Sequence, residues 1–156
     1  MTTGLLRGAA AGAAGTTVLN AVTYLDMVVR GRGTSSTPEQ LVEKITKTVG
    51  VDVPGDDDTR ENRLQGLGPL SGIAVGIAVG AASGLVGRLL AKHGRHVPAP
   101  LAVLVISAAA MALSDVPLKL FGISDPKDWA LKDWAADIVP HLAYGATTYA
   151  TLKATN

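Results

Sequence analysis

Five polar residues near the end of the chain recur at spacings of four, three, four and three: Asp137, His141, Tyr144, Thr148 and Thr151. In a helix this spacing places all of them on one face. Asp137 and His141 are one turn apart, so the carboxylate can orient or charge the imidazole. In an apolar environment such a face predicts a wet cleft or a path for protons or small cations.

A structural interpretation of the same residues stays open. Asp137 comes at the start of its predicted helix, where an acidic side chain is favoured by the positive end of the helix dipole. His141 would then only donate a hydrogen bond to a neighbouring helix. Pro140, between the two, removes one backbone donor and frees the carbonyl of Ala136.

Three further polar residues lie in other apolar segments. Asn20 and Asp26 belong to the first segment, and Asp115 lies near the end of the third. The first and third segments of an up-and-down bundle run in the same direction, and the fourth begins where they end. We therefore predict that Asp26, Asp115, Asp137 and His141 converge at one end, where a buried carboxylate needs a partner, a proton or a cation.

Other site chemistry is not indicated. The chain has no cysteine, no pair of histidines with metalloprotease spacing and no glycine-rich loop after a strand. His93 and His96 are three residues apart in a basic connection, which is typical of a solvated turn rather than a metal site. We predict no catalytic residue, no metal and no cofactor.

A ladder of glycines organises the helices that would position these groups. Gly72, Gly76, Gly80 and Gly84 recur at every fourth residue. Glycine disfavours helices in water, but in lipid the backbone must satisfy its own hydrogen bonds. The glycines then form a flat stripe on which another helix can pack closely.

Composition supports a membrane environment. Of the 156 residues, 47% are hydrophobic and only 17% are charged, and the mean hydropathy is +0.29; soluble domains are roughly 25% charged. We predict a single transmembrane domain over residues 1–156. It would be an all-α integral membrane four-helix bundle with spans at about 5–29, 68–91, 98–118 and 135–152. A signal peptide is the competing reading of the first span, but its apolar run is too long.

The connections carry weaker patterns. Leu41, Val42, Ile45 and Val49 predict a short amphipathic helix at the membrane surface, capped by Thr37 with Pro38 in its first turn. A solvated turn is predicted at Asp56, Asp57 and Asp58. A second helix cap is predicted at Ser124-Asp125-Pro126, and Trp129 and Trp134 flank the fourth span.

Net charge and its distribution bear on partners and orientation. A formal charge of +1 without a basic run argues against nucleic acid. The basic connection from Arg88 to His96 favours the cytoplasmic side, which would place both termini there as well.

Two segments resemble a known family. Residues 115–126, followed by Asp137 and by His141-Leu142-Ala143-Tyr144-Gly145, resemble the YagU-like family of small bacterial inner-membrane proteins, as does the Pro-Glu segment at 36–41. The resemblance covers about half of the chain and implies a multi-pass protein of the bacterial inner membrane without a diagnostic catalytic motif.

Three functions remain open. The first is a scaffold or accessory subunit, with the lipid bilayer and either a second copy or another membrane protein as partners, joined through the glycine face. The second is a proton or small-cation transporter that uses the acidic residues and His141. The third is a membrane enzyme acting on a lipid.

Overall fold

The computed structural model of the protein describes residues 2–155, all of whose regular structure is helical. The helices are α1 (Thr2–Arg30), α2 (Thr37–Thr48), α3 (Asp57–Lys92), α4 (Ala99–Leu120), the 3-10 turn η1 (Pro126–Asp128) and α5 (Leu131–Ala154). The prediction of an all-α fold is confirmed.

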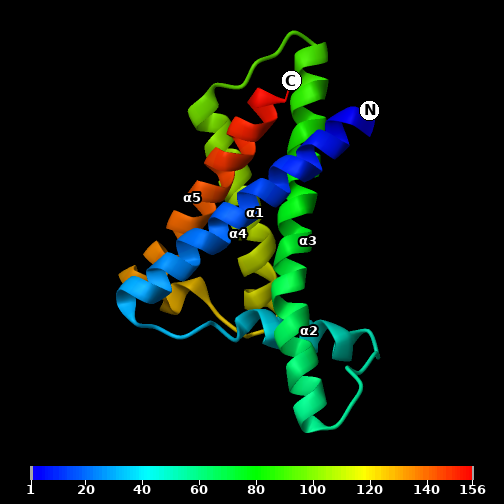
Figure 1. Ribbon diagram of the computed structural model, residues 1–156, viewed down its shortest axis with the longest axis vertical. Coiled ribbons are helices and arrows are strands. Elements are labelled where there is room, and N and C mark those ends of the chain that lie inside the picture. Colours follow the sequence, from blue (N-terminus) through cyan, green and yellow to red (C-terminus); the bar gives the residue numbers. More distant parts are fainter. Residues whose placement is uncertain (1, 156) are drawn as a thin grey trace.

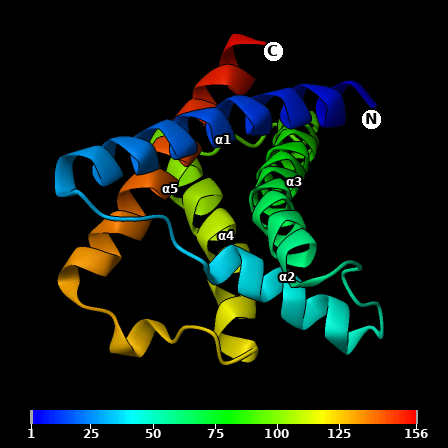
Figure 2. The same ribbon diagram turned by 60° about the horizontal axis from the view of Figure 1, so that its bottom comes forward.

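Four long helices run alternately up and down. Figure 1 shows α3 upright, α1 crossing it obliquely, and α5 beside α1 with α4 behind. The start of α1, the α3–α4 connection and the end of α5 form what we call the upper end. The end of α1, α2, the start of α3, the end of α4, η1 and the start of α5 form the lower end (Figures 1 and 2).

The start of α3 differs from the prediction. The helix begins at Asp57 rather than near residue 68, because the Asp56 carboxylate accepts a 2.9 Å hydrogen bond from the backbone N–H of Thr59. Asp57 and Asp58 fill the first turn, where the helix dipole favours acidic side chains. The predicted solvated turn is therefore a helix N-terminus, and α3 extends about 54 Å.

The surface helix α2 occurs where the sequence predicts it, with one correction. Thr37 is its first helical residue rather than its cap. Ser36 occupies the capping position without a side-chain hydrogen bond to the backbone, and its Oγ instead accepts from Gln40 Nε2 at 2.9 Å. The second predicted cap is confirmed: Asp125 accepts a 3.0 Å hydrogen bond from the Lys127 N–H before η1.

Glycines on both partners make the α1–α3 crossing. Gly4, Gly8 and Gly12 of α1 lie against Gly84, Gly80 and Gly76 of α3, so the two backbones touch. Gly72 lies outside this contact, since a Cβ added there would meet no atom within 4 Å. Because α1 covers Gly76, Gly80 and Gly84 within one chain, this part of the stripe offers no open face to a second copy.

Large apolar side chains point outward and small or polar ones point inward. The fully or nearly buried residues include Thr16, Ser107, His141 and Thr148, beside a small apolar cluster of Val79, Ile106, Ala110 and Tyr144. Exposed large side chains recur on every long helix, among them Leu6, Leu70, Val86, Leu101, Leu104, Val105, Leu113 and Val139. This distribution is the reverse of the usual one in soluble domains.

Two helices, α3 and α4, are long and apolar enough to cross a membrane. The helices α1 and α5, which are also predicted as spans, are long enough but less apolar over a span-length stretch than α3 and α4 and are not candidates on this ground. The fold is thus helical with two candidate membrane-spanning helices.

Candidate functional site

Three ionisable side chains meet where the end of α4 lies against the start of α5. His141 Nδ1 lies 3.2 Å from Asp137 Oδ1 and 2.8 Å from the Asp137 carbonyl oxygen, one turn earlier on α5. Asp115 of α4 lies close enough to interact electrostatically with both. We call these three residues the Asp–His cluster. Their convergence follows from the antiparallel packing of α4 on α5.

The cluster is mostly removed from solvent. The side chain of His141 is 10% exposed and that of Asp137 is 18% exposed. Asp137 Oδ2 is buried and has no hydrogen-bond partner among the described residues. Buried carboxylate oxygens rarely remain unpaired, so this atom marks a place for a proton or another electropositive group.

The geometry of His141 sets its protonation chemistry. A proton on Nδ1 can be donated to the Asp137 carbonyl or carboxylate, which leaves Nε2 as an acceptor in the neutral ring and a donor in the charged ring. Two carboxyl groups and one imidazole lie near one another here, and each of them can carry or release a proton. The cluster is therefore chemically suited to binding and releasing protons.

Asp26 does not join the cluster. Arg32 Nε lies 2.5 Å from Asp26 Oδ2, and Arg30 lies 3.4 Å from its Oδ1. Arg30 also donates a 3.2 Å hydrogen bond to the carbonyl of Lys132 and so ties the end of α1 to the start of α5. The two arginines directly after the first apolar segment were the available signal for this pairing. Asn20 is half-buried on α1, and its side chain makes no hydrogen bond within residues 2–155.

The upper part of the predicted polar face is closed and structural. Tyr144 and Thr148 have no exposed surface. Tyr144 Oη donates a 2.6 Å hydrogen bond to the carbonyl of Gly76 on α3, and Thr148 Oγ1 donates a 3.5 Å bond to the carbonyl of Ala11 on α1. Thr151 is half-buried. Of the predicted polar face, only the part formed by Asp137 and His141 can therefore line a water-filled cleft.

Sequence reasoning missed the partners that hold α5 in place. Gly15 of α1 leaves room for Tyr144, and Gly145 lies against Ser107 and the carbonyl of Val103 on α4. Gly4, Gly8 and Gly12 recur at every fourth residue, as do the glycines of α3, and this spacing could have revealed the α1–α3 contact.

The other two histidines lie outside the Asp–His cluster. His93 and His96 are exposed in the α3–α4 connection. Within residues 2–155, no three His, Asp or Glu side chains are arranged to hold a metal ion.

No family model, no curated protein and no solved structure matches this chain. The resemblance to the YagU-like family therefore stays a prediction.

Proposed function

We propose that this chain is a four-span membrane protein that takes up and releases protons at the Asp–His cluster, as part of proton or small-cation movement. In this proposal α1 and α5 cross the bilayer together with α3 and α4. The observation that carries the chemistry is the pairing of Asp137 and His141 beside Asp115, with Asp137 Oδ2 buried and unpaired.

The outward-facing apolar side chains support the membrane part of the proposal. Each large apolar side chain moved from water to lipid is favourable by about 1.5–3 kcal/mol. A soluble helical bundle would bury most of these residues, whereas here the interior holds glycine, threonine, serine and histidine around one small apolar cluster. Small residues and internal hydrogen bonds are the contacts that hold helices together in lipid.

The test is infrared spectroscopy and proton flux on purified protein in liposomes. We expect a carboxylic-acid carbonyl band that changes with pH and disappears in Asp115→Asn or Asp137→Asn, together with flux that both variants abolish. Asp128→Asn removes an exposed acidic side chain in η1 and should leave both signals intact. A wild-type band and flux indistinguishable from those of Asp137→Asn would contradict the proposal.

One observation favours a second candidate, a structural subunit of a membrane assembly. Tyr144 and Thr148 are fully buried and tie α5 to α3 and α1, so the bundle is closed directly above the cluster. In this case the Asp–His cluster would join helices rather than carry protons. Flux equal to that of empty liposomes, with His141→Gln lowering thermal stability, would favour this second function.

A further inference from the structure

Acidic side chains are confined to one end of the molecule, whereas basic side chains occur at both ends. All 13 acidic residues lie on elements of the lower end, on α2, η1, their connections and the adjoining ends of the long helices. The ionisable side chains of lysine, arginine and histidine at the upper end have no acidic side chain beside them in the part of the chain that the structure describes. They are Arg7, Arg88, Lys92, His93, Arg95, His96 and Lys153.

The arginines and lysines of the upper end make no ion pair within residues 2–155. All the ion pairs there involve residues of the lower end. An unpaired cluster of this kind creates a positive potential that anionic groups can approach without displacing an internal partner.

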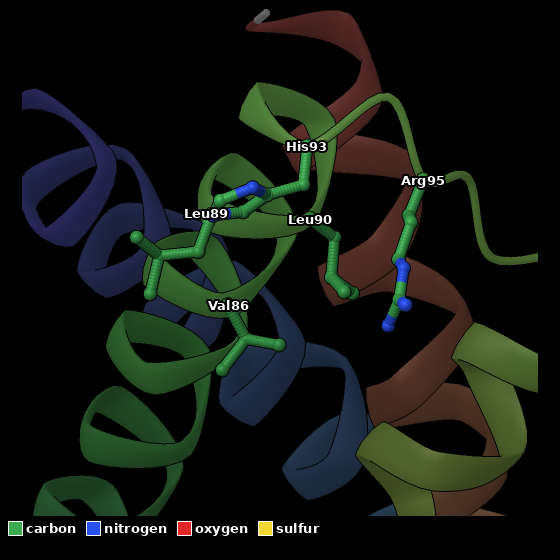
Figure 3. A pocket seen from close by; sticks show the side chains of 5 residues that line it. All are labelled: Val86, Leu89, Leu90, His93 and Arg95. Carbon is green, nitrogen blue, oxygen red and sulfur yellow. The ribbon is translucent and has the colours of Figure 1, made fainter.

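An open groove lies within this basic end, where α3 passes into the α3–α4 connection. It encloses about 650 Å³ and is lined by Val86, Leu89, Leu90, His93 and Arg95. Figure 3 shows the His93 ring beside Leu89, while the Arg95 side chain extends back toward the level of Leu90. The groove therefore has an apolar wall along α3 and basic side chains at its outer edge.

We propose that this groove binds an anionic phospholipid, with its phosphate at Arg95 and His93 and an acyl chain along Val86, Leu89 and Leu90. The inference rests on the proposed insertion into a membrane. Val86 and Leu89 are 52% and 44% exposed, so they are free to contact an acyl chain. A soluble anion would use the basic side chains but would have no reason for the apolar wall.

Anionic lipids are concentrated in the cytoplasmic leaflet, so a lipid in this groove would place the upper end on the cytoplasmic side. The number of lysines and arginines does not by itself set the orientation, because the lower end carries nine of them and the upper end five.

The experiment measures lipid selectivity by electron paramagnetic resonance. Full-length protein is reconstituted in phosphatidylcholine with trace spin-labelled phosphatidylglycerol or spin-labelled phosphatidylcholine, and the immobilised fractions are compared. Each basic side chain near an anionic lipid contributes roughly a five-fold preference. We therefore expect the wild type to select phosphatidylglycerol, and the His93→Gln/Arg95→Gln double variant to lose at least that factor.

Lys44→Gln is the matched control, because it removes an exposed positive charge from α2 at the lower end and should leave the selectivity unchanged. Should the double variant fail to fold, wild-type selectivity must still fall as salt is raised, since salt screens the interaction. Equal immobilisation of the two lipids by the wild type would overturn the lipid site. Inorganic phosphate and unlabelled phosphatidylglycerol are then compared as competitors at the same ionic strength. If inorganic phosphate abolishes the selectivity as effectively as phosphatidylglycerol does, the groove binds a soluble anion rather than a lipid.

Protease protection of the same liposomes separates the two proposals. Chain that is inserted but shows no lipid preference refutes only the lipid site. Chain that stays at the vesicle surface and is fully digested refutes the membrane proposal on which the lipid site rests.

Discussion

At the scale of single residues, polar side chains in the interior divide into two kinds. Tyr144, Thr148 and Thr16 each donate to a backbone carbonyl, so their hydroxyl groups are satisfied and serve packing. Asp137 keeps one buried carboxylate oxygen without a partner. Satisfied groups stabilise a fold, whereas an unsatisfied one is retained at a cost of about 1–3 kcal/mol and points to function.

Tyr144→Phe tests the first kind. The variant keeps the ring but leaves the Gly76 carbonyl without its side-chain donor, so we expect a loss of about 1 kcal/mol in the free energy of unfolding. Denaturant unfolding in detergent, followed by circular dichroism, measures it. Tyr24→Phe removes an exposed hydroxyl from α1 and should be neutral. Equal effects of the two substitutions would disprove the role of this hydrogen bond.

At the scale of elements, the crossing of α1 and α3 depends on glycine at specific positions. A Cβ at Gly80 would collide with the backbone of Gly8 and Gly12, which belong to another helix and cannot rotate away as a side chain can. Backbone contact of this closeness lets many weak dispersion interactions add up.

Gly80→Ala should therefore force the helices apart and cost about 1–3 kcal/mol, the range for overpacking. Gly72→Ala is the matched control on the same stripe, because its Cβ meets no atom within 4 Å. Steric-trapping or denaturant measurements of stability would separate them. Alanine favours the helix more than glycine does, so a Gly72→Ala variant as unstable as Gly80→Ala would mean that the loss of stability does not come from the α1–α3 contact.

The contact between α2 and α3 includes an ion pair. Glu43 of α2 lies 2.6 Å from Lys47 Nζ and also contacts Arg60 of α3. Hydrogen bonds from Lys47 and then Arg60 lower the pKa of the Glu43 carboxyl, against a smaller opposing effect of burial. A separate contact lies near η1, where the rings of Trp129 and Trp134 pack nearly edge to face with their centroids 5.1 Å apart.

This lowered pKa predicts how the docking of α2 depends on pH. The stabilisation is fully present above the ordinary glutamate pKa of about 4.3 and is lost as the pH falls through the lower pKa of folded Glu43. The hydrogen-exchange protection factors of the α2 amides, which correct for the intrinsic exchange rate at each pH, should therefore fall in acid. Glu43→Gln should show the low protection already at neutral pH, with a loss of up to about 1 kcal/mol. Slow exchange of α2 in that variant at neutral pH would rule out the Glu43 contacts as its anchor.

At the scale of the whole molecule, the alternating direction of the four long helices makes one topological prediction. The chain has no cysteine, so single cysteines report position without background. Thr34→Cys at the lower end and His96→Cys at the upper end should be labelled from opposite sides of a sealed vesicle by an impermeant maleimide. Thr155→Cys should behave like His96→Cys. Labelling of Thr34→Cys and His96→Cys from the same side would exclude the four-span arrangement.

Local patterns in the chain were sufficient for the helical class, the position of α2, the Asp125 cap and the approach of Asp115 to Asp137 and His141. These features depend on periodicity, capping residues and the direction of successive helices, which are properties of neighbouring residues. The length of α3 was underestimated because the hydropathy of residues 57–67 is low, while capping by Asp56 and the helix dipole act independently of hydropathy.

Tertiary packing decided which of the candidate groups are available for chemistry. Asp26 is paired by Arg30 and Arg32, and Gly76, Gly80 and Gly84 are covered by α1, although nothing in their local spacing distinguishes paired from free groups. It also collected every acidic side chain at one end and left the other purely basic. Contacts between helices depend on the relative rotation of each helix, and only the folded arrangement of all four fixes those rotations together.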